Sequence, residues 1–334
     1  MVERKRGTMP AGRKEREDGK TAPAGTRFAP LDFEGFLRAT GHAPLTDLIR
    51  EAFAREEPLP PALHRKSLQL FREYLLVGGM PSVVDVYVRT QSLEEAEKEK
   101  RRLLNVLRRD LKRLPGGLRS KTGKILQEVP AQLAKSEKRF TLSALGQSAR
   151  WRNCADAFAR LEDLGLILPA LAAVPEESFG ADRDSAARKC CFVDTGLLAT
   201  LAVRAGLVSK AELVRGVLFG KFSLLNGMLL ENAVAQILAK KDGQLLHFSQ
   251  SGKKAGEERI EIDFLLLRPS PEAGGALRVS PVEVKPSVRF RALSLERFAE
   301  RFGEIVGTEY VVYPGPLRRE GRRLLVPLYA AHCL

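Results

Sequence analysis

The sequence predicts an α/β protein of several domains, in which an N-terminal helical region and a winged helix precede a mixed α/β domain. Three observations lead to this prediction. Apolar residues recur at helical spacing across residues 28–115, and residues 116–180 show the order helix, short helix, turn, helix and strand hairpin. In residues 186–334, short strand-like runs alternate with helical segments. A chain of 334 residues is long enough for this organisation.

The N-terminal region divides into a tail and a series of helices. Residues 1–27 are charged, interrupted by Gly and Pro and almost free of large apolar groups, which predicts a disordered basic tail. Asp32 and Glu34 place acidic groups at the start of the first helix, and Thr46 is a candidate N-cap for the second. Gly78-Gly79 is expected to end the third helix.

A strongly basic helix is predicted toward the end of the helical region. Together with a net charge of +14, it favours a polyanionic partner, most often nucleic acid. A solvated helix face on an inert basic surface is the alternative. The residues predicted to contact DNA are Arg101, Arg102, Arg108, Arg109, Lys112, Arg113, Arg150 and Arg152.

Residues 116–180 are predicted to form a winged helix. If it binds DNA, the second helix of its helix-turn-helix pair lies against the duplex. Trp151, between Arg150 and Arg152, begins that helix and is either a base-stacking residue or, as is more usual for a single Trp, part of the core. A winged helix that mediates only protein contacts is the alternative.

The domain of residues 186–334 contains an acidic residue in an otherwise apolar helix, Glu231, where a carboxylate is costly without a partner. Asp263 follows on a strand, and Glu283 and Lys285 share one face of the next strand. This order is that of the PD-(D/E)xK nucleases, which have a restriction-endonuclease-like fold. Each element alone is common on protein surfaces, so the prediction depends on their combination.

The strand that carries Asp263 shows an alternating pattern. Its apolar residues Ile260, Ile262, Phe264 and Leu266 are expected to share one face, with Glu261 and Asp263 on the other face.

The four polar residues have distinct expected roles in this chemistry. Asp263 and Glu283 are expected to bind one or two Mg²⁺ (or Mn²⁺) ions, which prefer carboxylate oxygens. The metal polarises the scissile phosphate and helps to generate hydroxide. Lys285 is expected to stabilise the attacking water or the developing negative charge, and Glu231 to orient a metal-bound water.

Other classes of site have no support in the sequence. The four cysteines form no CxxC pair, which indicates a reduced protein, and the cytoplasm is the expected location. No membrane span or secretory signal is recognisable, and no Gly-Lys pair has the spacing of a phosphate-binding P-loop, so no ATP site is expected. The four histidines show no metal-ligand spacing.

Several motifs, taken in order, resemble bacterial and archaeal AAA-type ATPases that carry a C-terminal domain of unknown function with a restriction-endonuclease-like fold. The motifs are PLDFEGFLRATG, YLLVGGMPSVVDVYV, RRDLKR, FARLEDLGLI, VDTGLLATL, LLENAVAQIL, EIDFLLL and PVEVKPS. The resemblance implies that residues 28–115 correspond to the end and helical lid of an ATPase module. Family members carry a P-loop domain before this segment, and no residue here matches its motif.

Two hypotheses of different classes follow. The first is a DNA-associated enzyme with a nuclease-like domain that hydrolyses phosphodiesters with Mg²⁺. The second is a non-catalytic DNA- or protein-binding module, a shortened member of the ATPase family without its motor domain. Besides DNA, the expected protein partner is either a second copy of the chain or a separate ATPase.

Overall fold

The computed structural model describes residues 30–135, 139–175, 179–182, 187–220, 224–250, 258–269 and 275–334, without the side chains of 224–226. The predicted tail, residues 1–27, lies outside the described residues. The helices are α1 (Phe33–Ala39), α2 (Ala43–Arg55), α3 (Pro61–Val77), α4 (Pro81–Thr90), α5 (Leu93–Lys112), α6 (Gly116–Leu133), α7 (Trp151–Asp163), α8 (Thr195–Arg204), α9 (Lys210–Leu218), α10 (Leu224–Asp242) and α11 (Leu293–Phe302), with 3₁₀ helices η1 (Leu142–Leu145), η4 (Gly303–Ile305) and η5 (Leu328–Cys333). The strands are β1 (Ile167–Val174), β2 (Gly180–Ala181), β3 (Arg188–Phe192), β4 (Leu245–Gln250), β5 (Ile260–Pro269), β6 (Leu277–Val284), β7 (Glu309–Tyr313), β8 (Arg318–Glu320) and β9 (Arg323–Pro327).

The first helices begin and end largely where their sequence predicts. Asp32 caps α1, because its side chain accepts a hydrogen bond from the Gly35 amide at 2.8 Å. The predicted N-cap of α2 is wrong: the helix begins at Ala43 with Pro44 in its first turn, and Thr46 is buried within it. Proline suits this position because it has no amide hydrogen to leave unpaired. Helix α3 ends before Gly78, as expected.

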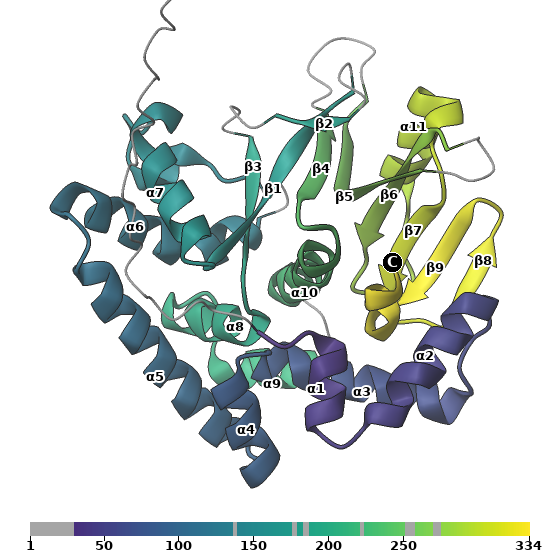
Figure 1. The fold of residues 1–334 in the computed structure, drawn as a ribbon, viewed down its shortest axis with the longest axis horizontal. Coiled ribbons are helices and arrows are strands. Elements are labelled where there is room, and N and C mark those ends of the chain that lie inside the picture. The colour runs from purple at the N-terminus through teal and green to yellow at the C-terminus, as the bar shows by residue number, and fades with distance from the viewer. Residues whose placement is uncertain are drawn as a thin grey trace, which may run out of the picture.

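The described strands form one mixed sheet with the order β2-β1-β4-β5-β6-β7-β9-β8, and β3 also pairs with β1 (Figure 1). Strands β4, β5 and β6 are antiparallel neighbours, whereas β6 and β7 are parallel. A parallel pair needs a crossover connection, and α11 lies in the segment that joins β6 to β7. The prediction of an α/β protein is therefore confirmed at the level of a mixed sheet with helices.

Two clusters of buried apolar side chains form the core. The larger cluster extends along the chain from Phe33 to Leu334 and joins α1–α10 to one side of the sheet. The smaller cluster contains Leu295 and Phe298 of α11 together with sheet residues such as Phe248. The larger cluster includes side chains from each of the three ranges 28–115, 116–180 and 186–334, so these ranges share a common core.

The strand hairpin predicted for the winged helix is part of the main sheet. After α6, η1 and α7, strand β1 pairs with β3 in an antiparallel ladder from Ile167↔Phe192 to Leu171↔Arg188. The same β1 also pairs with β4 in a parallel ladder. The helices follow in the expected order, but residues 167–174 form a single strand, and its long antiparallel partner β3 lies beyond residue 180, in the range expected to belong to the C-terminal domain.

The turn at Gly78 and Gly79 packs tightly against the start of α8. Asp194, the fully buried N-cap of α8, accepts hydrogen bonds from the amides of Gly79 at 2.6 Å and Leu197 at 2.7 Å. A Cβ atom at Gly79 would lie 1.9 Å from the Leu31 carbonyl oxygen, and one at Gly78 would lie 2.4 Å from the Asp194 carboxylate. Gly78 also has a φ of +83°, so glycine is required on both steric and conformational grounds.

A buried lysine of α5, Lys100, also contacts the end of α3. Lys100 of α5 donates a hydrogen bond to the Leu76 carbonyl at 2.6 Å and forms an ion pair with Glu97 at 3.0 Å. Glu97 in turn accepts a hydrogen bond from Thr200 of α8. Burial raises the pKa of Asp194 above its ordinary value, whereas the two amides and the Lys100 charge act in the opposite direction.

Replacement of the central carboxylate tests this junction. Asp194→Ala leaves two buried amides without their acceptor, so we expect the free energy of unfolding to fall by about 3 kcal/mol. Urea denaturation followed by circular dichroism measures the change. The control is Asp85→Ala, which removes an exposed ion pair with Arg89 and should change stability by less than about 0.5 kcal/mol. Equal effects of the two variants would show that the junction is not a stabilising contact.

Candidate carboxylate and lysine site

The structure brings the four residues predicted for catalysis into one region. Asp263 occupies its centre: its Oδ1 accepts a hydrogen bond from Lys189 at 3.4 Å, and its Oδ2 accepts one from the Val284 amide at 2.9 Å. Lys189 also donates to Oε1 of Glu231, at 3.2 Å. Asp263 thus links Glu231 of α10 to the end of β6.

Glu283 and Lys285 flank the Val284 amide at that end of β6. Their side chains form an ion pair, with 2.6 Å between Lys285 Nζ and Glu283 Oε2. The Lys285 amide also donates to the Val312 carbonyl of β7 at 2.8 Å, which fixes the backbone at this point. The β5–β6 ladder extends as far as the pair Phe264 and Val282, and the Val284 amide beyond it donates to Asp263, which holds this carboxylate at the end of β6.

The predicted alternation along β5 is wrong because the strand contains a β-bulge. Leu246 of β4 pairs with Leu265, whereas Phe248 pairs with Ile262, so one β4 residue faces two residues of β5, Asp263 and Phe264. A bulge of this kind re-aims the side chains on either side of it. Ile262 consequently belongs to the smaller core cluster and Phe264 to the larger one.

Lys189 of β3 is the site residue that sequence reasoning missed. Its side chain is 1% exposed, and its ammonium donates to Glu231 Oε1, to Asp263 Oδ1 and, at 3.4 Å, to the Asp263 carbonyl oxygen. The available signal was a pair of cationic residues, Arg188 and Lys189, at the start of a strand that continues with the apolar residues CCF, because a charge is rarely buried without a partner. The strand alone does not reveal the partner, since Glu231 and Asp263 are 42 and 74 residues away.

Helix α10 is fixed against β3 by the residue that follows Glu231. The Asn232 side chain accepts a hydrogen bond from the Phe192 amide at 2.7 Å and donates one to the Phe192 carbonyl at 3.0 Å. This paired contact with the backbone of β3 sets the depth and rotation of the helix. It therefore holds Glu231 within reach of Lys189.

The metal was expected between Asp263 and Glu283, but in the structure Glu283 forms its ion pair with Lys285, and Asp263 shares the Lys189 ammonium with Glu231. Three oxygens of Glu231 and Asp263 converge, but the point that they share is taken by the Lys189 ammonium, 3.2–3.4 Å from each. A Mg²⁺ ion is held at about 2.1 Å from its oxygen ligands and has no room beside this ammonium. Within the described ranges, no group of three or more His, Cys, Asp or Glu side chains is arranged to hold a metal ion.

Burial favours the neutral forms of two groups near Asp263, so it raises the pKa of one, an acid, and lowers the pKa of the other, a base. It raises the pKa of Glu283 to about 7, the negative charge of Asp263 adds to this increase, and Lys285 opposes it. His247, which lies opposite the bulge, is fully buried, and burial together with the Lys189 charge lowers its pKa to about 3. His247 is therefore neutral in the folded protein at physiological pH.

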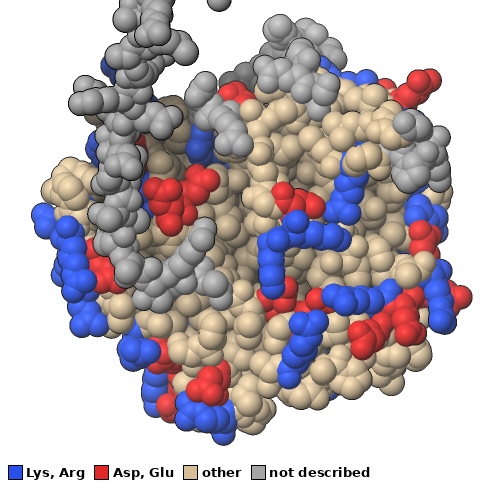
Figure 2. Space-filling view, viewed as in Figure 1, with Lys and Arg blue, Asp and Glu red and all other residues tan. Residues whose placement is uncertain are grey.

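The six basic residues predicted along α5 and at its C-cap are exposed, and three of them are paired with acidic residues. Arg101, Arg102 and Arg113 form ion pairs with Glu97, Glu99 and Asp110, respectively. Arg108, Arg109 and Lys112 have no carboxylate within ion-pair distance in the described part of the chain. Blue side chains follow the left edge of the molecule in Figure 2, where Figure 1 places α5.

The start of α7 exposes the other two predicted basic residues. Arg150 and Arg152 are exposed, and Arg150 is the N-cap residue of the helix. Trp151 between them is half-buried and is covered by the Arg188 guanidinium, 3.8 Å from the ring centroid. Its ring also contacts Phe158, so Trp151 is part of the packing and not free to stack on a base.

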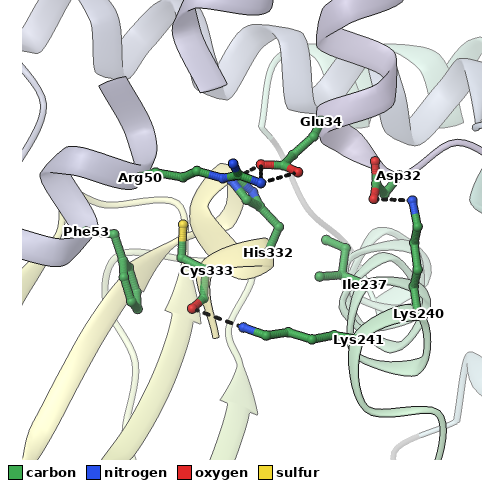
Figure 3. Close-up of a pocket in the computed structure, with 9 residues that line it drawn as sticks. All are labelled: Asp32, Glu34, Arg50, Phe53, Ile237, Lys240, Lys241, His332 and Cys333. Atoms are coloured by element: carbon green, nitrogen blue, oxygen red, sulfur yellow. Dashed lines mark hydrogen bonds and ion pairs between the residues drawn. The ribbon is translucent and has the colours of Figure 1, made fainter. Parts of the chain in front are cut away.

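A separate cavity of about 520 Å³ lies where α1, α2, α10 and η5 meet (Figure 3). Ion pairs of Glu34 with Arg50 and of Asp32 with Lys240 cross its walls. Lys241 donates a hydrogen bond to the Leu334 carbonyl. These contacts tie residues 332–334 to the first helices.

Comparison with known proteins gives one match. A family model described as a domain of unknown function (DUF8612) matches residues 68–208. No curated protein and no solved structure matches the chain. The matched range includes Lys189 and Asp194 but not Glu231, Asp263 or Glu283. Among the described helices, none combines the length and apolar character needed to cross a membrane.

The raised pKa of Glu283 predicts a pH-dependent effect of its replacement. The contribution of Glu283 to wild-type stability falls as pH rises from about 4.5 to about 7, because its carboxyl retains a proton in the folded chain that the unfolded chain releases. Glu283→Gln removes this dependence, so the stability of the variant relative to wild type should increase over that interval by an amount on the order of 3 kcal/mol. Urea denaturation at half-unit pH steps measures it, with the exposed Glu51→Gln as control. A pH-independent difference would show that Glu283 titrates normally.

Proposed function

We propose that the chain binds the phosphate backbone of DNA through α5, and that its carboxylate cluster supports the fold without a metal-dependent reaction. The observation that carries this proposal is the set of three exposed cations, Arg108, Arg109 and Lys112, with no acidic partner among the described residues. Unneutralised Lys and Arg side chains along one helix suit a polyanion, because each phosphate contact releases condensed counterions. Arg150 and Arg152 are further candidates for phosphate contact.

The proposal includes a relation of the C-terminal part to PD-(D/E)xK nucleases. The element order α10, β4, β5, β6, α11, β7 and the proximity of Glu231, Asp263, Glu283 and Lys285 support it. On the same proposal, residues 28–115 correspond to the end and lid of an AAA-type ATPase module and α6–β3 to a winged helix. The Lys189 ammonium supports loss of metal chemistry in this relative, because it supplies the positive charge that a metal would bring.

The basic helix is tested by removing its unpaired cations. The triple variant Arg108→Ala, Arg109→Ala, Lys112→Ala should bind a random-sequence 20-base-pair duplex at least about tenfold more weakly at low salt. The slope of log affinity against log salt concentration should become shallower by about 3, because three phosphate contacts are lost. Fluorescence anisotropy over a range of KCl concentrations measures both quantities.

The matched control is the triple variant Arg38→Ala, Arg55→Ala, Arg89→Ala. It removes the same charge from three exposed arginines that lie within 4 Å of acidic residues. Equal losses in the two triple variants would show that only net charge matters, and retained wild-type affinity in the α5 variant would contradict the proposed surface.

Metal-dependent phosphodiester hydrolysis is the second candidate function. It is favoured by the ion pair of Glu283 with Lys285, whose side chain is 25% exposed, next to the Val284 amide that donates to the Asp263 carboxylate. Incubation of linear, nicked and branched DNA with Mg²⁺ or Mn²⁺ distinguishes the two candidates. Cleavage that is lost in Asp263→Ala and reduced by roughly 10²–10³ in Lys285→Ala would establish the enzyme. No cleavage by the wild type supports the binding module.

A further inference from the structure

The Lys189 ammonium is surrounded by the kinds of oxygen atom that bind a metal cation. It contacts one carboxylate oxygen from each of Glu231 and Asp263 and one main-chain carbonyl oxygen, that of Asp263. Carboxylate and carbonyl oxygens are the groups that hard divalent cations select. The phenyl ring of Phe264 lies 5.7 Å from the same nitrogen and covers a further side.

The strand that carries Lys189 is not adjacent in the sheet to the strand that carries Asp263. Lys189 lies on β3, and strands β1 and β4 separate β3 from β5 in the sheet. Its neighbour across the β1–β3 ladder is Ala170, whose small side chain leaves room for the lysine to extend toward Asp263. The Asn232 contact with Phe192 fixes Glu231 at the other end of the same path.

The charges around the ammonium explain why a cation is needed there. Glu231 and Asp263 are 3% and 16% exposed, and Glu283 lies directly beyond Asp263. A buried carboxylate without a compensating positive charge is strongly unfavourable.

We propose that Lys189 is a built-in cation that occupies the place of a divalent metal, so that the wild-type chain binds no metal at Glu231 and Asp263. Replacing Lys189 with a small neutral residue then leaves two carboxylates and a carbonyl oxygen around a vacant position and creates a divalent-cation site. This inference rests on the part of the proposed function that concerns the carboxylate cluster, and it does not depend on the part that concerns nucleic acid.

Thermal unfolding with and without metal tests the inference. Wild type, Lys189→Ala and Lys100→Ala are compared in metal-free buffer, in 10 mM MgCl₂ and in 10 mM MnCl₂. We expect Lys189→Ala to have a lower Tm than wild type and to regain at least about 3 °C with Mn²⁺, as a ligand that binds only the folded state requires. The wild-type Tm should change by less than about 1 °C.

Lys100→Ala is the matched control, because it also removes a fully buried ammonium but leaves only Glu97 within ion-pair distance among the described residues. It should be destabilised without recovering in metal. In the double variant Lys189→Ala, Asp263→Asn, the recovery seen in Lys189→Ala should be lost.

Three results would overturn the inference: a Tm increase of the wild type with metal, no recovery in Lys189→Ala, or equal recovery in Lys100→Ala. If Lys189→Ala does not fold in metal-free buffer, its refolding yield on dilution from urea with and without 10 mM Mn²⁺ replaces Tm as the readout. A yield that rises with Mn²⁺ supports the inference, and a yield independent of Mn²⁺ contradicts it.

Discussion

The contact between the Asp194 carboxylate and the Gly79 amide is the constraint on which the arrangement of the helical half depends. It joins the end of α3 to the start of α8, 115 residues further along the chain, within a region too tight for any side chain at Gly79. Lys100 adds α5 to the same junction through the Leu76 carbonyl. Because α8 leads from β3 toward α10, the junction also aligns the helices with the sheet that carries the carboxylate cluster.

The sequence was sufficient to predict features set by local chemistry. Asp32 at the start of α1 and Gly78-Gly79 after α3 were recognisable because capping and chain reversal depend on a few adjacent residues. The residue types of Asp263, Glu283 and Lys285 on two successive strands indicated that they lie near one another, because strands that follow each other along the chain commonly pair. Thr46 misled because a proline two residues earlier starts the helix sooner.

The features that escaped prediction depend on contacts between distant segments. The bulge at Asp263 and Phe264 is invisible in an alternating apolar pattern, because one extra residue changes the facing of a strand without changing its composition. The sequence around Lys189 does not indicate its partners, because they lie on α10 and β5. A Glu-x-Lys pattern predicts residue types that suit a metal site. Whether a lysine ammonium already lies between the carboxylates depends on the tertiary structure.

The packing of η5 against α1, α2 and α3 has a consequence for synthesis of the chain. His64 of α3 contacts the hydroxyl of Tyr329, 265 residues later, and the last residues complete the core around the first helices. At translation rates of roughly 5–20 residues per second, the early helices wait on the order of 10–50 s before η5 is made. Their apolar faces are exposed on the ribosome during that interval, so nascent chains of this protein should be clients of chaperones that bind hydrophobic segments.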